Sequence, residues 1–364
     1  MTVIVIHSST NERGGVFNAS LSHTHGLLSA GTPAELWTAS PAAERAATAL
    51  DIPVFRHDAV AEPWAALWSG AIWRRGKATQ DVRAVLHQGG KSWLWAWALW
   101  PGAVHAVRFP NYRIGDRRLF RNWMAVSTRH ADRLRQEKTL GFLTPKVATV
   151  KNGDVQSASK RVPPRRPFRA DGPMVIGALG TLSDRKGQDL LIKALAELRR
   201  RGIDAELRLG GGPGNRREAF ERLAASLGVE QQVKFLGWVD AIDFMSELDV
   251  FCLPSRSEPF GIVLLEAMAQ ALPVVASDVD GPADILAADA GLLVPADNAD
   301  AFADALATLA GDPAAAVALG ERARDRAAAE FSPYAVGDCL LEAFQAFGAR
   351  IQRPGDVEPS PNRA

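Results

Sequence analysis

Residues 255–281 read SRSEPFGIVLLEAMAQALPVVASDVDG, and this stretch combines two carboxylates with one predicted helix. Glu258 stands directly before Pro259-Phe260-Gly261, and the apolar run that follows predicts a helix that begins near Gly261. The free N–H groups at a helix N-terminus form a ready anion site, and glycine lets a ligand approach the backbone closely. Glu266 would lie about five residues along this helix, ~7.5 Å from its start at ~1.5 Å per residue. A carboxylate, an anion site and a second carboxylate on one element suit a ligand with hydroxyls at both ends and phosphates between them, such as a nucleotide-sugar.

The same stretch has a simpler interpretation, which is a buried amphipathic helix with a solvated Glu at each end. The residues after the helix favour the nucleotide-sugar interpretation over this simpler one. Residues 273–277 (PVVAS) predict a short buried strand, and residues 278–282 (DVDGP) predict a turn. This order of Glu, loop, helix, strand and turn resembles the signature of glycosyltransferase family 4, the retaining GT-B enzymes also described as glycosyl transferases group 1.

Other segments of the C-terminal half resemble pieces of the same family, in the same order and with similar gaps. A Gly-rich loop after a strand is common by itself, whereas an ordered series of such pieces is specific. The series comprises a first strand (MVIGALG, 174–180), a donor-phosphate loop (LSDRKG, 182–187) with the helix after it (188–200), a strand with a Gly-rich end (AELRLGGGPG, 205–214), a strand by the nucleobase (VKFLGW, 233–238) and two closing pieces (AGLLVP, 290–295, and EFS, 330–332).

The resemblance implies an α/β fold of the GT-B type, in which two Rossmann-like domains face a central cleft. The alternation of strand-like and helix-like segments in both halves independently predicts parallel sheets covered by helices. We expect an N-terminal acceptor-binding domain over 1–154, a Pro- and Arg-rich linker over 155–172 and a nucleotide-sugar-binding domain over 173–333. A helix over 334–351 would cross back to the N-terminal domain, and 352–364 would form a disordered tail.

The resemblance also implies a donor site. Glu258 would contact the donor sugar as a catalytic residue, and Glu266 would bind the ribose hydroxyls. A departing diphosphate is stabilised by cations and by backbone N–H groups. The resemblance implies that these groups come from Lys186, Arg185, Gly261, Ile262, Val263 and the glycine loop Gly14-Gly15.

The N-terminal domain of the family usually offers a His near the reacting sugar. We predict His105 for this catalytic role, with Arg108 and the earlier His87 as alternatives. Another departure from the family is Thr181, which occupies the position of a phosphate-binding Arg. Either donor binding is weaker for this reason, or a different Arg reaches the phosphates.

Charge is divided unequally between the two halves. Residues 1–172 hold 24 Lys and Arg against 12 Asp and Glu, a net charge of +12, whereas residues 173–364 have a net charge of −11. Nine of the ten Trp also lie in the N-terminal half, and Trp93, Trp97 and Trp100 share a helical face by their spacing. Most of these Trp are expected in the core, yet basic residues with some exposed Trp also fit an anionic membrane surface. No nucleic-acid motif is present, so nucleic acid is not expected as a partner.

The implied function is retaining transfer of a sugar from a nucleotide-sugar to a saccharide acceptor. We expect a lipid-linked saccharide of cell-surface polysaccharide or lipopolysaccharide synthesis, in a cytoplasmic protein that is peripheral on the membrane. No cofactor or metal is expected, since Asp278-Val279-Asp280 falls in a turn that the family has without metal. The alternative is a catalytically impaired nucleotide-sugar-binding or scaffold subunit. A dinucleotide oxidoreductase is disfavoured because residues 7–15 lack G-x-G-x-x-G.

Overall fold

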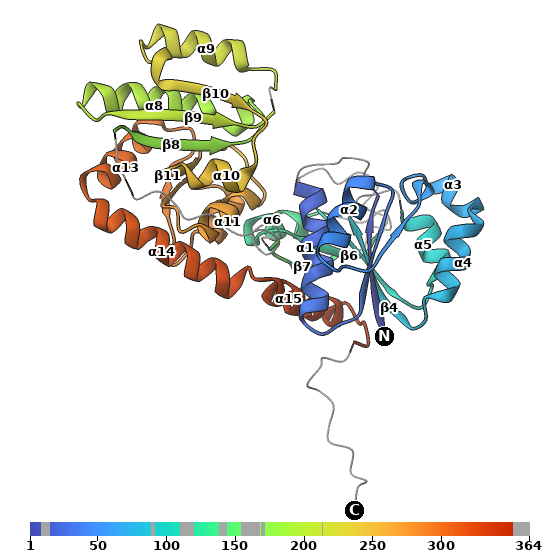
Figure 1. The fold of residues 1–364 in the computed structure, drawn as a ribbon. Coiled ribbons are helices and arrows are strands. Elements are labelled where there is room, and N and C mark those ends of the chain that lie inside the picture. The colour runs from blue at the N-terminus through green and yellow to red at the C-terminus, as the bar shows by residue number, and fades with distance from the viewer. Residues whose placement is uncertain are drawn as a thin grey trace, which may run out of the picture. The chain divides into compact units, whose positions relative to one another are not determined.

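The computed structural model describes residues 1–8, 15–88, 92–109, 120–137, 144–153, 168, 172–212 and 214–351. These residues fall into two units, Met1–Val155 with Glu330–Ala364, and Gln156–Ala329. Each unit is built on one parallel sheet with helices between successive strands (Figure 1). The predicted tail 352–364, Gly14 and most of the predicted linker 155–172 lie outside the described residues.

The first unit contains a seven-stranded sheet in the order β3-β2-β1-β4-β5-β6-β7, with every neighbouring pair parallel. Strand β1 is buried along nearly its whole length, as expected for a parallel strand covered on both faces. The strand order reverses between β1 and β4, which pair with His7 opposite Gln88 at their carboxyl ends. The strands are β1 (Thr2–His7), β2 (Ala34–Thr38), β3 (Val54–Arg56), β4 (Val82–Gln88), β5 (Val104–Arg108), β6 (Asn122–Ala125) and β7 (Lys146–Thr149).

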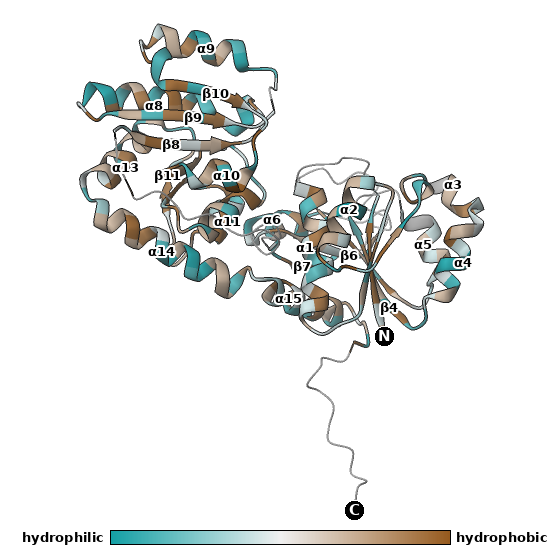
Figure 2. Cartoon of the chain, in the orientation of Figure 1, coloured by the Kyte–Doolittle hydropathy of each residue, from teal (hydrophilic) through white to brown (hydrophobic). Residues whose placement is uncertain are grey.

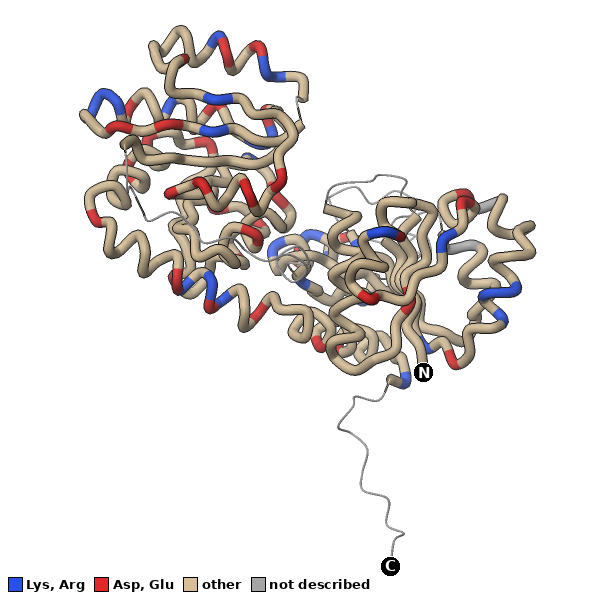
Figure 3. Tube along the Cα trace, viewed as in Figure 1, with Lys and Arg blue, Asp and Glu red and all other residues tan. Residues whose placement is uncertain are grey.

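Two separate apolar clusters cover the two faces of this sheet, because successive strand residues point to opposite faces. Val3 and Val5 pack with α1 and α15, whereas Ile4 and Ile6 pack with α3, α4 and α5. Basic residues of this unit lie on α4 and α6 (Figure 3). The helices are α1 (Gly15–Ser29), α2 (Pro41–Ala49), η1 (Asp58–Ala61), α3 (Pro63–Trp68), α4 (Gly70–Ala78), α5 (Trp93–Leu99), α6 (Thr128–Arg135) and α15 (Pro333–Ala346).

Helix α15 comes from the C-terminal end of the chain and packs on α1, as the crossover prediction requires. Two glycines allow the close approach. A Cβ on Gly337 would lie 1.9 Å from the carbonyl oxygen of Gly26, and a Cβ on Gly26 would lie 2.8 Å from that of Pro333. Both distances are shorter than real Cβ contacts, so larger residues at these positions would force the helices apart.

The second unit contains a six-stranded sheet in the order β10-β9-β8-β11-β12-β13, again with parallel pairing throughout. Figure 2 shows its strands largely brown, whereas the surface helix α9 (Arg217–Ser226) alternates teal with tan. The strands are β8 (Met174–Leu179), β9 (Ala205–Gly210), β10 (Val233–Gly237), β11 (Val250–Leu253), β12 (Val274–Ser277) and β13 (Leu292–Val294).

The helices of the second unit alternate with these strands, and α8, α9 and α13 pack on one face of the sheet. Among the described residues no single helix is long and apolar enough to cross a membrane. Helices α13 (Ala299–Gly311) and α14 (Pro313–Glu330) would be long and apolar enough only together, and the chain bends by 108° at their junction. The helices are η3 (Asp184–Lys186), α8 (Gln188–Arg200), α9 (Arg217–Ser226), η4 (Glu230–Gln232), α10 (Ala241–Ser246), α11 (Ile262–Ala269), α12 (Asp280–Ile285), α13 (Ala299–Gly311) and α14 (Pro313–Glu330).

Two local predictions from the sequence are wrong. Residues 278–282 are not only a turn, because α12 already begins at Asp280 and holds Pro282 in its first turn, where proline is tolerated. Trp97 and Trp100 do not share a face, because α5 ends at Leu99. Trp97 is exposed, whereas Trp100 is buried in the apolar cluster under α5.

Candidate functional site

The candidate site lies where the strand order of the second sheet reverses. The chain runs outward from β8 through β9 to β10, then returns to form β11 on the other side of β8. In open parallel sheets, ligands bind outside the carboxyl ends of the strands at such a reversal. Two loops leave the sheet there, the loop after β8 that ends in η3 and the loop after β11 that leads to α11.

These two loops carry an ion pair between Lys186 and Glu258. Lys186 Nζ donates to Glu258 Oε2 at 2.5 Å, and the side chains are only 17% and 11% exposed. The Arg185 guanidinium lies 3.9 Å from the same carboxylate oxygen and donates to the carbonyl of Ser257. The structure therefore brings together three of the predicted site residues, two cations and one carboxylate.

Backbone geometry holds the two loops against each other. Gly187 adopts a φ of +69°, and a Cβ there would lie 2.0 Å from the carbonyl oxygen of Pro254. Only glycine fits this position, because it needs both the left-handed conformation and the close approach. The Arg256 backbone N–H donates to the carbonyl of Arg185 at 2.8 Å. The cations therefore sit on a backbone fixed to the loop that carries Glu258.

The Arg256 side chain was not predicted from the sequence, yet it joins three segments. Its guanidinium makes two parallel bonds to Asp189 of α8, at 2.9 and 2.7 Å, and a third to Asp297 at 2.7 Å. It also donates to the carbonyl of Asp184. Burial alone would raise the pKa of Asp189, but the hydrogen bonds and charge of Arg256 hold it below its ordinary value. No local sequence signal marks this residue, since its partners are distant in the chain.

Helix α11 begins as predicted from the sequence. Gly261 is its N-cap, with a φ of +100° and no side-chain capping hydrogen bond, and Ile262 is its first residue. Ile262 and Val263 are half-buried in the first turn, where N–H groups have no partner within the helix. Glu266 lies in the same helix and is 3% exposed. The predicted order of carboxylate, helix N-terminus and second carboxylate is therefore present.

Three glycines, Gly180, Gly211 and Gly212, lie between Lys186 and the end of β10, and we call them the glycine floor. A Cβ on Gly180 would lie 3.6 Å from Lys186 Cε, and a Cβ on Gly211 would lie 2.4 Å from the Gly180 carbonyl oxygen. A Cβ on Gly212 would lie 2.9 Å from the Trp238 ring. Trp238 is 62% exposed and follows β10 at the carboxyl edge of the sheet. The sequence placed the segment 233–238, which ends in Trp238, by the nucleobase, but gave this Trp no role of its own.

Thr181 is exposed in this loop, and its carbonyl accepts from Gln188 of α8 at 3.2 Å. Arg216, at the entrance to α9, forms an ion pair at 2.8 Å with Asp184, two residues before Lys186. Arg185 and Arg216 are thus two cations close to this loop, and the expectation that a different Arg replaces the one missing at position 181 stays a prediction.

The carboxyl edge of the first sheet holds a buried polar network. Arg108, at the end of β5, donates to Gln88 at 3.3 Å and to Asn152 at 2.6 Å. Because the Gln88 oxygen accepts from Arg108, its amide nitrogen donates to Nδ1 of His23 at 2.6 Å. Burial and the nearby Arg108 charge lower the pKa of His23 well below its usual range. Gly15 opens α1 at this edge, exposed and with space around its Cα.

His105 lies three residues before Arg108, and both of its ring nitrogens have partners. Nε2 donates to the carbonyl of Trp100 at 3.0 Å, which leaves Nδ1 to accept from Nε2 of His87 at 3.1 Å. His87 Nδ1 then accepts from the Ser92 hydroxyl at 2.8 Å. Burial lowers the pKa of both rings, so both are neutral at pH 7. The catalytic role of His105 stays a prediction, and it would require these internal bonds to be exchanged.

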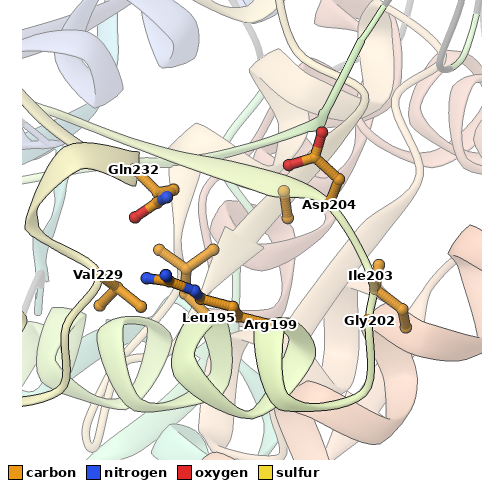
Figure 4. Close-up of a pocket in the computed structure, with 8 residues that line it drawn as sticks. Leu195, Arg199, Gly202, Ile203, Asp204, Val229 and Gln232 are labelled. Carbon is orange, nitrogen blue, oxygen red and sulfur yellow. The ribbon is translucent and has the colours of Figure 1, made fainter.

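Two cavities lie at the amino ends of the strands, on the edge of each sheet opposite to the carboxyl edge. One of about 240 Å³ lies beside the amino end of β9, where Arg199 and Gln232 extend over Val229 (Figure 4). Another of about 300 Å³ lies beside the buried Glu35 of the first unit and its exposed partner Arg75. Neither includes a predicted site residue. Within the described part of the chain, no three His, Cys, Asp or Glu side chains gather as a metal site would require.

The sequence is similar to one protein family and to several characterised proteins. Residues 163–326 match the family model of glycosyl transferases group 1. The lipopolysaccharide core biosynthesis glycosyltransferase LpsE of Rhizobium meliloti is 35% identical over 175 residues, which are 48% of this chain and 50% of LpsE. A GDP-mannose-dependent phosphatidylinositol monomannoside mannosyltransferase of Mycolicibacterium smegmatis is 35% identical over 242 residues, 63% of this chain and 61% of that protein. The chain thus spans between half and two thirds of these relatives.

Anabaena HepE, solved in complex with UDP and glucose, has a TM-score of 0.74 to this structure, with 95% of this chain and 100% of HepE covered. At 17% sequence identity this likeness establishes the shared fold, with its two Rossmann-like domains. The prediction of a GT-B fold is confirmed, whereas the cleft between the domains stays a prediction. Residues 163–326 thus match the glycosyl transferases group 1 model, and the fold of the whole chain is shared with a GT-B glycosyltransferase.

Proposed function

We propose that this protein is a retaining glycosyltransferase that takes a sugar from a nucleotide-sugar. One observation carries the proposal, the Lys186–Glu258 pair at the reversal between β8 and β11. A largely buried cation and carboxylate in contact at a ligand-binding edge suit a donor with a diphosphate beside a sugar. The sequence relationship to the group 1 glycosyltransferases supports the same donor class.

In this proposal Lys186 and Arg185 stabilise the diphosphate as it departs, together with the first-turn N–H groups of α11. Glu258 would contact the donor sugar as positive charge develops on its first carbon. Glu266 would accept from the ribose hydroxyls. The new bond would form on the face that the diphosphate leaves, which retains the configuration. No metal or cofactor is invoked, since cations and N–H donors meet the phosphate charge.

The nucleobase would lie at the other end of the glycine floor, against Trp238. Gly180, Gly211 and Gly212 leave the strip between Lys186 and Trp238 without side chains. A diphosphate at Lys186 would therefore leave a flat base within reach of the indole, and base–aromatic stacking is favourable for every base. Trp238 would support the base without selecting among UDP, GDP and ADP.

For the acceptor we propose a lipid-linked saccharide of cell-surface polysaccharide or lipopolysaccharide synthesis, reached by a cytoplasmic protein on the inner face of the membrane. The names of two relatives support this choice, since one acts in lipopolysaccharide core biosynthesis and the other on phosphatidylinositol monomannoside. The net charge of +12 over residues 1–172 supports an anionic surface near the N-terminal unit.

A thermal-shift panel of UDP, GDP and ADP with their common sugar conjugates tests the donor site, on the wild type and on Lys186→Ala. A ligand that binds only the folded state raises the Tm by mass action. We expect a shift with one nucleotide, which Lys186→Ala loses. Nucleotide-sugar hydrolysis to the free nucleotide, followed with Glu258→Ala, then tests the chemistry. Binding without turnover in the wild type would favour the impaired or scaffold subunit, and no shift with any nucleotide would overturn the proposal.

A further inference from the structure

Helix α5 is apolar on every side, although one side of it is exposed. Its seven residues read WLWAWAL and include no polar or charged side chain. Trp95 and Ala96 are fully buried in the cluster on the sheet, whereas Trp97 is 61% exposed and Ala98 is also exposed. A helix that is apolar all round is normally buried, so the outer side of α5 is suited to something other than water.

Helix α3 repeats this pattern beside it. Its residues read PWAALW, with Ala66 buried, Ala65 exposed and Trp68 89% exposed. A side chain two positions from a buried one points about 200° away around a helix of 3.6 residues per turn. Trp68 is related in this way to Ala66, and Trp97 to Trp95, so both indoles point away from the sheet. We call Ala65, Trp68, Trp97 and Ala98 the indole surface.

Helix α4 ties these two helices together and adds positive charge. The Trp73 indole of α4 donates to the carbonyl of Leu67 in α3 at 2.7 Å, and Gly76 lies directly against the Leu99 side chain of α5. Ile72 is buried, so Arg74 points outward by the same two-residue relationship, and Lys77 is also exposed. Figure 3 shows basic residues in blue on α4.

Two exposed cations belong to the same group of helices as the indole surface. Arg74 and Lys77 are exposed, whereas Arg75 pairs with the buried Glu35 and Arg56 pairs with Asp58. Among the described residues, Glu62, the N-cap of α3, and Asp58 of η1 are exposed acids of this region, and Arg56 pairs with Glu44 as well as with Asp58. Exposed indoles beside cations are the combination that favours the boundary between lipid headgroups and acyl chains.

We infer that the indole surface docks the first unit onto an anionic lipid bilayer, with the Trp68 and Trp97 rings at the headgroup boundary and Arg74 and Lys77 on the phosphates. The inference rests on the proposed function only in that a lipid-linked acceptor would give docking a purpose. The surface itself lies on the face of the first sheet opposite to α1 and α15.

The exposed area argues for a bilayer over a protein partner. An indole side chain presents ~150–250 Å², so the exposed parts of Trp68 and Trp97 amount to about 300 Å² together. A stable protein interface needs about 800 Å² on each partner. Two indoles with nearby cations are sufficient for reversible bilayer binding, because apolar insertion and electrostatic attraction act together.

Flotation of the full chain with vesicles tests the inference without any nucleotide-sugar, so that its outcome is independent of sugar transfer. The vesicles are made of equal parts phosphatidylcholine and phosphatidylglycerol, or of phosphatidylcholine alone. The test variant is Trp68→Ser with Trp97→Ser, and the matched control is Tyr334→Ser, an aromatic that is 62% exposed on α15. A second variant, Arg74→Gln with Lys77→Gln, removes the two cations. Equal Tm values establish that each variant is folded.

We expect the wild type and Tyr334→Ser to float with anionic vesicles at low salt. The double Trp variant should lose binding by tenfold or more, and the double Gln variant by about fivefold per cation removed. Equal flotation of the double Trp variant and the wild type would overturn the inference. So would absence of flotation together with a dimer that the double Trp variant abolishes in sedimentation equilibrium, because a second copy would then be the partner of the surface.

Discussion

Lys186 Nζ lies 2.5 Å from Glu258 Oε2, although the two residues are 72 positions apart in the chain. The ion pair holds the Lys186 ammonium in place. In the proposed donor site, the diphosphate would share Lys186 with Glu258. As the phosphate took over the ammonium, the Glu258 carboxylate would become available to the sugar, so that recognition of the phosphate and recognition of the sugar would be coupled.

Glu258→Gln separates these two effects, because the amide keeps the size of the side chain and removes its charge. We expect affinity for the free nucleoside diphosphate to stay equal or to rise by up to ~10-fold, since the carboxylate no longer competes for Lys186. Turnover of the nucleotide-sugar should fall by ~100-fold or more, since the charge near the reacting carbon is lost. Calorimetric titration and nucleotide release measure the two quantities. A loss of nucleotide affinity as large as that of Lys186→Ala would contradict this account.

Trp238→Ala tests the proposed base platform. Removal of the indole should weaken binding of the nucleoside diphosphate by ~10-fold, as expected for the loss of one stacked base. Binding of inorganic pyrophosphate, which has no base, should not change. Leu236→Ala is the control, since this exposed residue lies two positions earlier on β10. Equal losses for pyrophosphate and nucleotide would mean that Trp238 shapes the loop and does not contact the base.

Local sequence patterns predicted those parts of the site in which a residue and its neighbours determine the conformation. Gly261 before an apolar run predicted the start of α11, and the apolar residues before Asp278 predicted β12. The Lys186–Glu258 contact and the role of Arg256 could not be predicted in this way, because each depends on two loops that meet only in the folded sheet. The end of α5 at Leu99 likewise depends on packing, which explains the error about Trp100.

Gly337→Ala should destabilise the first unit. The added methyl would lie 1.9 Å from the Gly26 carbonyl oxygen, so α15 and α1 must separate. Overpacking of this kind costs ~1–3 kcal/mol, which thermal or urea unfolding would detect. Gly311→Ala in α13 is the matched control, because no atom lies within 4 Å of its Cβ position. Equal stability of the two variants would show that the helix crossing adjusts without cost.

The buried imidazoles predict that stability falls in mild acid. Burial lowers the pKa of His23, His87 and His105 in the folded protein, whereas the unfolded chain titrates near the ordinary value of ~6.5. The unfolded state therefore binds more protons as the pH falls below ~6.5, and stability present above that pH is progressively lost. Urea unfolding at several pH values measures the slope. His87→Gln should reduce the slope, and an unchanged slope would assign the acid sensitivity to other groups.

Arg256→Gln should destabilise the second unit and impair the donor site, although Arg256 is a positioning residue. The substitution leaves the largely buried Asp189 carboxylate without its two-bond partner, and breaking such a pair costs ~3–5 kcal/mol in a fully buried setting, less here because Lys193 lies 3.9 Å away. The loop after β11 would also lose its attachment to α8, so Glu258 and Lys186 should no longer be held at one distance. We expect kcat for nucleotide-sugar turnover to fall more than nucleotide affinity. Arg256→Gln with Asp189→Asn should recover most of the stability, because the uncompensated carboxylate is gone, but not the kcat. Recovery of both together would mean that Arg256 acts on the site through stability alone.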